Sequence, residues 1–290
     1  MAEPLTRPAR AKVNLDLLVT ARRPDGYHEL DSLVVFAGAA DTVTVAAAAD
    51  LSLEVKGRYA GDVPPGEGNH VLGAARALAA AVGCAPRARL TLVKDLPVAS
   101  GIGGGSSDAA ATLHALCRLW GLEMPAERLR DIGLTIGADL PVCLYGAAVR
   151  MRGIGERLDP VRGLPDLPLL LVNPGVAVPT GPVFRALRLA DEPKPRAVLP
   201  PHPSLGELAA WLAASRNDLQ APAVSIAPVI GTLLDELQAL PDCLVARMSG
   251  SGATCWALFP DARRLAAAHA TLVAAHPAWW SWAGVVPAGA

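Results

Sequence analysis

The feature that most constrains the fold is a glycine-rich stretch at residues 97–108, Pro-Val-Ala-Ser-Gly-Ile-Gly-Gly-Gly-Ser-Ser-Asp. Before it, residues 88–93 alternate small or polar side chains with apolar ones, a pattern typical of a half-buried strand. After it, apolar side chains recur at helical spacing over residues 109–120, and Gly121 ends the pattern. A glycine loop that runs into a helix exposes unpaired N–H groups and the positive end of the helix dipole, so the sequence predicts a phosphate-binding loop.

Within this loop, the glycines permit positive φ angles and close approach of a ligand to the backbone. We expect Ser106, Ser107 and Asp108 to cap the first helical turn, and the Ser107 hydroxyl is also suited to phosphate or magnesium. A Walker A loop requires Gly-Lys-Ser/Thr, whereas Gly105 is followed here by Ser106. The dinucleotide fingerprint requires a glycine where Ser106 stands. Neither motif fits, and the alternative interpretation is a surface loop without a ligand.

Composition indicates a globular protein. The 290 residues are 52% hydrophobic and carry a net charge of −1, so we expect one large domain or two ordinary ones and no general attraction to nucleic acid or an acidic membrane. No stretch reaches the ~18 apolar residues of a membrane span, and the N-terminus does not resemble a signal peptide. The five cysteines form no CxxC pair, which predicts a reducing compartment. We therefore expect a cytoplasmic protein without nucleic-acid or membrane partners.

Several other segments show a clear periodicity. Residues 12–19 alternate, which predicts a strand with Lys12, Asn14 and Asp16 on a polar face. Residues 160–168 are rich in proline and glycine, so we expect a domain boundary that divides the chain into residues 1–158 and 159–290. The segments expected as further strands are 33–36, 42–45, 51–55, 169–172, 243–248 and 254–259, and those expected as helices are 69–82, capped by Asn69, 126–134 and 262–275.

Lys12 and Asp139 are the ionisable pair of greatest interest. Phosphoryl transfer needs a carboxylate to accept the proton of the acceptor hydroxyl and a cation to offset negative charge. If both residues lie beside the glycine loop, they form such a site. Taken singly, the lysine is typical of a solvated strand face and the aspartate is typical of a cap or turn.

Two further segments allow a structural or a functional interpretation. Residues 249–252, Ser-Gly-Ser-Gly, are typical of a turn between strands, and their amides and hydroxyls also suit phosphate. Tyr27 and His28 follow a Pro-Asp-Gly turn, where they suit stacking on a flat ligand and hydrogen bonding to its edge.

Together these segments resemble the GHMP kinases, a family with three separated motifs in this order. Residues 11–15 (Ala-Lys-Val-Asn-Leu) resemble its first motif, residues 97–108 its second, and residues 248–254 (Met-Ser-Gly-Ser-Gly-Ala-Thr) its third. Residues 23–30 and 137–142 resemble those members that phosphorylate a cytidine diphosphate derivative. The resemblance implies a two-domain α+β fold with the active site in the cleft between domains. A ribosomal-protein-S5-like N-terminal domain would bind ATP and carry the catalytic residues, and a ferredoxin-like C-terminal domain would bind the substrate.

The resemblance also implies roles for individual residues. Asp139 is the expected general base and Lys12 its catalytic partner. Tyr27 and Phe184 are expected to sandwich the cytosine, with His28 at its edge. The residues expected to bind substrate are Asn14, Tyr27, His28, Asp139, Thr180 and Phe184; those expected to bind ATP are Asn69, Lys94, Pro97, Val98, Ala99, Ser100, Gly101, Ile102, Gly103, Gly104, Gly105, Ser106 and Ser107; the third-motif loop is Ser249, Gly250, Ser251 and Gly252.

The implied reaction is ATP-dependent phosphorylation of the 2-hydroxyl of 4-diphosphocytidyl-2-C-methyl-D-erythritol, a step of non-mevalonate isoprenoid precursor biosynthesis. ATP is the expected co-substrate and Mg²⁺ the expected ion, although the sequence contains no dedicated carboxylate cage for it. No protein partner is indicated. The alternatives are a GHMP kinase with another acceptor, such as mevalonate or homoserine, and a non-catalytic nucleotide-binding regulator of the same fold. Many members of the family have glycines where this chain has Ala99 and Ser100.

Overall fold

The computed structural model describes residues 3–189 and 196–288. These residues contain helices together with a seven-stranded and a four-stranded sheet. They divide into two compact units. Unit 1 comprises Met1–Ala11, Ala39–Val98 and Gly103–Gly146, and unit 2 comprises Lys12–Gly38, Ala99–Ile102 and Ala147–Ala290. The units therefore alternate along the chain, and the domain boundary expected near residue 158 stays a prediction.

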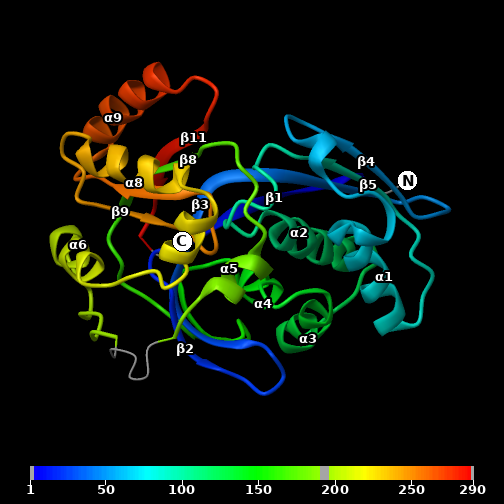
Figure 1. The fold of residues 1–290 in the computed structure, drawn as a ribbon. Coiled ribbons are helices and arrows are strands. Elements are labelled where there is room, and N and C mark those ends of the chain that lie inside the picture. Colours follow the sequence, from blue (N-terminus) through cyan, green and yellow to red (C-terminus); the bar gives the residue numbers. More distant parts are fainter. Residues whose placement is uncertain (1–2, 190–195, 289–290) are drawn as a thin grey trace. The chain divides into compact units, whose positions relative to one another are not determined.

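Unit 1 combines strands with a cluster of helices. Strand β4 (Ser52–Lys56) runs parallel to β5 (Arg89–Val93), which runs antiparallel to the second part of β3 (His28–Ala46). Strand β1 (Leu5–Asn14) also pairs with β3. The helices are α1 (His70–Val82), α2 (Gly104–Leu119), α3 (Ala126–Ile136) and α4 (Leu140–Tyr145), with the 3₁₀ turns η1 (Ala60–Asp62) and η2 (Gly66–Gly68) before α1. Helix α1 packs against α2 and α3, and α4 packs against α2 and α3 (Figure 1).

Helix α1 begins and ends where the sequence predicts. The side-chain oxygen of Asn69 accepts hydrogen bonds from the N–H groups of Val71 and Leu72, at 2.9 and 3.3 Å. At the other end, Gly83 adopts a φ of 69°, a conformation that costs glycine little because it has no Cβ. The expected N-cap role of Asn69 is therefore confirmed.

Helix α2 begins differently from the prediction. Its N-cap residue is Gly103, at a φ of 65°, and no side chain caps the first turn. Ser106, Ser107 and Asp108 lie inside the helix. The Ser107 hydroxyl donates to a buried cysteine sulfur of α4, at 3.4 Å, and the Asp108 carboxylate accepts a hydrogen bond from Lys94. The expected capping by these three residues is wrong, because two of them use their polar atoms in tertiary contacts and the helix starts earlier.

Unit 2 contains the four-stranded antiparallel sheet, in the order β11-β8-β10-β9. Its strands are β8 (Leu167–Asn173), β9 (Val245–Met248), β10 (Cys255–Leu258) and β11 (Trp280–Val286), and the helices of the unit are α5 (Thr180–Ala186), α6 (Leu205–Ala213), α7 (Gln220–Ile226), α8 (Val229–Ala239) and α9 (Ala262–Ala275). Helix α8 packs on β9 and β10, and α9 packs on β8 and β11 (Figure 1). The strands near residues 169–172, 243–248 and 254–259 and the helix at 262–275 are thus confirmed.

The other strands of unit 2 surround the first part of β3. Strand β2 (Leu18–Arg22) runs antiparallel to β3, with a register shift between Val19 and Ala21. Strand β3 also runs antiparallel to β6 (Val149–Gly153), and β6 in turn pairs with β7 (Arg157–Pro160).

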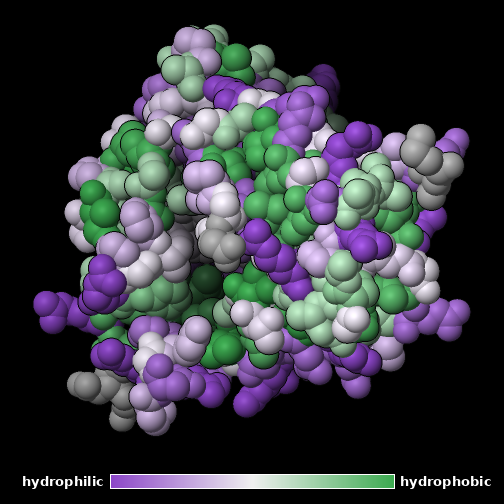
Figure 2. Space-filling model, turned by 90° about the vertical axis from the view of Figure 1, so that its right-hand side faces the viewer, coloured by the Kyte–Doolittle hydropathy of each residue, from purple (hydrophilic) through white to green (hydrophobic). Residues whose placement is uncertain are grey.

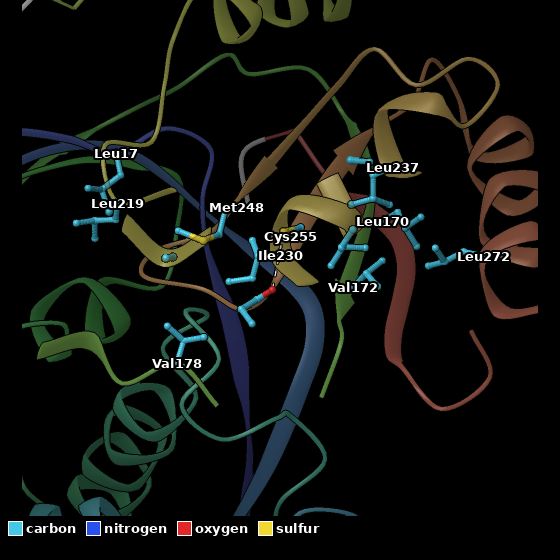
Figure 3. Packing of buried hydrophobic residues seen from close by; sticks show 14 of the residues in the cluster. Leu17, Leu170, Val172, Val178, Leu219, Ile230, Leu237, Met248, Cys255 and Leu272 are labelled. Atoms are coloured by element: carbon cyan, nitrogen blue, oxygen red, sulfur yellow. Dashed lines mark hydrogen bonds between the residues drawn. The ribbon is translucent and has the colours of Figure 1, made fainter. Parts of the chain in front are cut away.

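The apolar core of unit 2 lies between its sheet and its helices. Figure 3 shows Val172 of β8, Cys255 of β10, Ile230 and Leu237 of α8, and Leu272 of α9 in one cluster. All five side chains are buried. Each buried aliphatic side chain of this kind contributes roughly 1.5–3 kcal/mol relative to an exposed one, so this packing holds the sheet and both helices together.

The segment at residues 12–19 is not the single strand that its alternation predicts. Strand β1 ends at Asn14 and β2 begins at Leu18. The expected polar face is buried as well, since Lys12, Asn14 and Asp16 are at most 3% exposed. The expectation of one continuous strand is therefore wrong, and the polar side chains expected on one face are covered by other parts of the chain.

Strand β3 also differs from the prediction. Residues 33–36 and 42–45 are parts of one strand of 19 residues rather than of two. The small residues between them, Ala-Gly-Ala-Ala, continue the strand because neighbouring strands supply its hydrogen-bond partners.

The exterior agrees with the near-neutral composition. On the face seen in Figure 2, hydrophilic and hydrophobic side chains are interspersed, as is usual for folded chains. Within residues 3–189 and 196–288, no helix is both long enough and apolar enough to span a bilayer.

Candidate active site

The two halves of the glycine-rich loop belong to different units. Residues 99–102 belong to unit 2, whereas residues 97–98 and 103–107 belong to unit 1. In unit 2, Gly101 lies against the third-motif loop. A Cβ atom built on Gly101 would lie 2.4 Å from the carbonyl oxygen of Ser249. Only glycine fits at this position, so the contact between two sequence motifs explains its presence independently of any phosphate.

The Ser249 hydroxyl joins segments of three motifs within unit 2. It accepts a hydrogen bond from the N–H group of Asn14 and donates one to the carbonyl oxygen of Gly101, both at 3.0 Å. The N–H group of Lys12 donates to the carbonyl oxygen of Ile102 at 2.9 Å. The bonded residues lie 235 and 148 positions apart in the chain. The structure therefore brings together the first motif, part of the second and the third.

A buried ion cluster holds the first turns of α2 in unit 1. Lys94 Nζ lies 2.5 Å from Asp41 Oδ2 and 2.6 Å from Asp108 Oδ2, and the three side chains are at most 3% exposed. Asp41 Oδ1 also accepts the N–H groups of Asp95 and Leu96, at 2.6 and 2.8 Å. Lys94 thus bridges the end of β5 to α2. Its expected contact with ATP stays a prediction.

The cluster places one cation and two carboxylates in the interior. Both oxygens of Asp41 accept hydrogen bonds, whereas Asp108 Oδ1 has no hydrogen-bond partner among the described residues. Burial raises the pKa of Asp108 to about 7, with a further contribution from the Asp41 charge, and Lys94 opposes the shift. Asp108 is therefore the member of the cluster that takes up a proton near neutral pH.

Asn69 caps α1, and the residue after it, His70, lies beside the start of α2. The Asn69 side chain caps α1, and its Nδ2 donates to the carbonyl oxygen of Pro64 at 3.1 Å. The ring of His70 lies 3.6 Å from the position that a Cβ atom on Gly105 would occupy. Burial lowers the pKa of His70, and the Lys94 charge lowers it further. The role of Asn69 toward ATP stays a prediction, and its observed role is structural.

The expected cytosine-binding residues lie in unit 2. The rings of His28 and Phe184 stack, with 4.8 Å between centroids and an angle of 29° between planes. Tyr27 is 54% exposed. Thr180 of α5 shares a hydrogen bond of 2.9 Å with Ser251 of the third-motif loop. The structure thus brings His28 to Phe184 and Thr180 to Ser251, while the predicted sandwich of a base between Tyr27 and Phe184 stays a prediction.

Lys12 and Asp139 belong to different units, Lys12 to unit 2 and Asp139 to unit 1. Asp139 occupies the N-cap position of α4, but its side chain does not cap the helix. Lys12 is 3% exposed, so it is not the solvated strand lysine of the alternative interpretation. Their roles as base and partner stay predictions.

No compact metal centre accompanies these residues. Across the described part of the chain, no group of three or more His, Cys, Asp or Glu side chains is arranged to hold a metal ion. The start of α2 offers hydroxyl groups and backbone N–H groups. A hydroxyl oxygen can ligate Mg²⁺ and the N–H groups bind phosphate oxygens, so this helix start suits an ion that is held mainly by nucleotide phosphates and water.

Residues 69–147 match the family model described as "GHMP kinases N terminal domain", and residues 197–277 match "GHMP kinases C terminal". The chain belongs to the GHMP kinases, a family of small-molecule kinases, as the three motifs predict. The predicted α+β fold with an N-terminal and a C-terminal GHMP kinase domain is also confirmed. A kinase of this family uses ATP as co-substrate.

Individual proteins of known name are similar to this chain over most of its length. A 4-diphosphocytidyl-2-C-methyl-D-erythritol kinase of Cereibacter sphaeroides is 55% identical over 273 residues, which cover 94% of this chain and 95% of that protein. One of Paramagnetospirillum magneticum is 54% identical over 272 residues, with coverage of 94% and 95%. A crystal structure of 4-(cytidine 5'-diphospho)-2C-methyl-D-erythritol kinase has a TM-score of 0.75 and 34% identity, and the match covers 97% of this chain and 98% of that one.

Two residues at these sites are absent from the sequence predictions. Asp41 binds Lys94, and Ser32 binds Asn14. Asp41 lies within the apolar pattern of β3, where a charge is costly unless it is paired. An acidic residue in such a pattern is the signal that would have identified it. Ser32 carries no comparable signal, since a serine at the edge of an apolar run is common.

Proposed function

We propose that this chain transfers the γ-phosphate of ATP to the 2-hydroxyl of 4-diphosphocytidyl-2-C-methyl-D-erythritol, in the non-mevalonate route to isoprenoid precursors. The observation that carries this proposal is the 55% identity, over 94% of the chain, to a relative named for that substrate. A solved kinase of the same substrate also matches almost the whole chain.

In this reaction the acceptor oxygen attacks the γ-phosphorus, the bond from that phosphorus to the β–γ bridging oxygen breaks, and ADP leaves. Asp139 accepts the proton of the 2-hydroxyl, and Lys12 offsets the negative charge beside it. Residues 103–106 bind the phosphates through backbone N–H groups, since the N–H group of Ser107 already donates to the carbonyl oxygen of Gly103 at 2.8 Å. This role is supported by the first turn of α2, which no side chain caps. Mg²⁺, when bound with the nucleotide, neutralises phosphate charge.

The substrate's cytosine stacks between Tyr27 and Phe184, and His28 hydrogen-bonds to its edge. The exposed ring of Tyr27 supports this role, because it offers a free apolar face to a flat ligand. Burial lowers the pKa of His28, with a contribution from Arg22, so its ring is neutral at physiological pH. A neutral imidazole has both a donor and an acceptor for the base.

Another acceptor, such as mevalonate or homoserine, is not favoured, because curated relatives at 50–55% identity share the one name. A non-catalytic regulator is disfavoured for the same reason. Both alternatives predict a different outcome in an assay of the purified protein.

The test is ATP consumption with the cytidine substrate, beside mevalonate, homoserine and a control without acceptor. We expect turnover with the cytidine substrate alone. Phe184→Leu should raise the KM for that acceptor roughly 3- to 10-fold through loss of ring stacking, with the KM for ATP unchanged. Turnover with mevalonate or homoserine would replace the acceptor assignment, and ATP binding without any turnover would support the regulator.

A further inference from the structure

Asn14, the last residue of β1, is held at three of its four polar groups within unit 2. Its N–H group donates to Ser249 Oγ at 3.0 Å, and its carbonyl oxygen accepts from Trp256 Nε1 at 3.0 Å. Its side-chain Nδ2 donates to Ser32 Oγ at 2.7 Å. The fourth group, Oδ1, is buried and has no hydrogen-bond partner among the described residues.

Ser32 decides which end of the Asn14 amide is bonded. Its hydroxyl carries one proton and donates it to the carbonyl oxygen of Asp16, at 2.5 Å. The hydroxyl can then only accept from Asn14, so Nδ2 rather than Oδ1 must face it. Asp16 is itself fixed, because its carboxylate accepts the N–H group of Leu33 at 2.6 Å and the hydroxyl of Ser215 at 2.8 Å.

A second buried asparagine of unit 2 provides a contrast. Asn173 Nδ2 donates to the hydroxyl of Thr254 at 3.0 Å, and its Oδ1 accepts the N–H group of Gly175 at 2.8 Å. Both ends of that amide are therefore satisfied. A buried acceptor without a donor costs free energy. The hydrogen bonds around Asn14 fix its amide so that this acceptor is Oδ1. Such an atom is suited to a donor that comes from outside the chain.

We propose that Ser32 is a positioning residue, which holds the Asn14 amide so that Oδ1 accepts a hydrogen bond from a hydroxyl of the methylerythritol part of the acceptor. The inference rests on the proposed function and extends it by one residue and one atom. The neutral amide oxygen suits a neutral hydroxyl, since no charge has to be buried with it.

The first test compares Ser32→Ala with Ser32→Thr, which keeps the hydroxyl. Loss of the fixed amide should raise the KM for the acceptor roughly 3- to 10-fold, the equivalent of one hydrogen bond, and leave the KM for ATP unchanged. Ser32→Thr should restore the acceptor KM. Thr112→Val is a matched control, because it removes a buried hydroxyl that donates to a carbonyl oxygen in α2. It should lower stability without raising the acceptor KM.

The second test is a double-mutant cycle with Asn14→Ala. If Ser32 acts through Asn14, adding Ser32→Ala to Asn14→Ala should raise the acceptor KM no further. Additive effects, or an unchanged acceptor KM in Ser32→Ala, would overturn the inference and leave the proposed function intact. Absence of turnover by the wild type would overturn both. Should Ser32→Ala fail to fold, Ser32→Cys retains the size, and its weakly accepting sulfur should raise the acceptor KM in the same direction.

Discussion

Gly101 and Gly250 pack backbone against backbone. A Cβ atom on Gly250 would lie 2.5 Å from the carbonyl oxygen of Gly101. The φ angle is 75° at Gly101 and 54° at Gly250. A side chain is therefore excluded at each position for two reasons: the positive φ angle strains any residue with a Cβ atom, and backbone atoms of the other loop occupy the space. Two glycine motifs that look alike as phosphate loops thus also serve to bring their own loops into contact.

Replacement of Gly250 by alanine should lower the free energy of unfolding by about 2–4 kcal/mol, because the added Cβ meets backbone atoms that cannot rotate away. The matched control is Gly83→Ala, where φ is 69° and no atom lies within 4 Å. It should cost only about 1 kcal/mol, the price of the conformation alone. Urea unfolding of both variants measures the difference, and equal losses would show that the loop contact is unimportant.

The Asp108 carboxyl should make stability decline as pH rises. Its pKa is about 7 in the folded protein, against an ordinary value of 3.8. Between these pH values the folded protein binds more protons than the unfolded chain, so the free energy of unfolding falls from about pH 4 to about pH 7 and then levels off.

Asp108→Asn should remove this decline, since the amide resembles the protonated acid, and should leave the variant more stable than wild type at pH 8. Denaturant unfolding at a series of pH values measures both curves. Asp50→Asn, a change at an exposed position, should keep the wild-type profile. Parallel curves for wild type and Asp108→Asn would contradict the assignment of the proton to Asp108.

Ala99 is a non-glycine residue at a φ of 50°, in the glycine-rich loop. An L-residue pays about 1–2 kcal/mol in this region, and glycine avoids that cost but loses about 0.5–1 kcal/mol to chain entropy. Ala99→Gly should therefore raise the free energy of unfolding by about 0.5–1 kcal/mol. Ala80→Gly, in the exposed part of α1, should instead lower it by a similar amount. Thermal and urea unfolding measure these opposite signs, and a loss of stability in Ala99→Gly would contradict the assigned strain.

Asp139→Asn should lower kcat by roughly 10²- to 10⁴-fold while ATP still binds, because the amide cannot accept the proton of the acceptor hydroxyl. Steady-state kinetics and a separate ATP-binding titration measure the two effects. Asp131→Asn, on the exposed side of α3, removes a carboxylate from the same unit and should leave kcat unchanged. Near-normal turnover in Asp139→Asn would remove this residue from the mechanism.

Elements with local signals follow the prediction closely. Helix α9 (Ala262–Ala275) has the predicted bounds, and Asn69 caps α1 as expected. Both depend on residues a few positions apart, through caps and apolar spacing. The missed features have another origin. Residues 12–19 were expected to form one strand, yet β1 ends at Asn14 and β2 begins at Leu18. Residues 33–36 and 42–45 were expected as separate strands, yet they belong to one strand of 19 residues that neighbouring strands support.

The sequence by itself determined the family and the two-part α+β organisation, because these depend on motif order and periodicity. Only the tertiary structure decided the partners of the polar side chains. Ser249 bonds to a residue 148 positions away, Lys94 to one 53 positions away and Asn14 to one 18 positions away. A buried donor or acceptor must find a partner wherever the fold places one. That choice depends on which segments pack together, and no pattern of nearby residues encodes it.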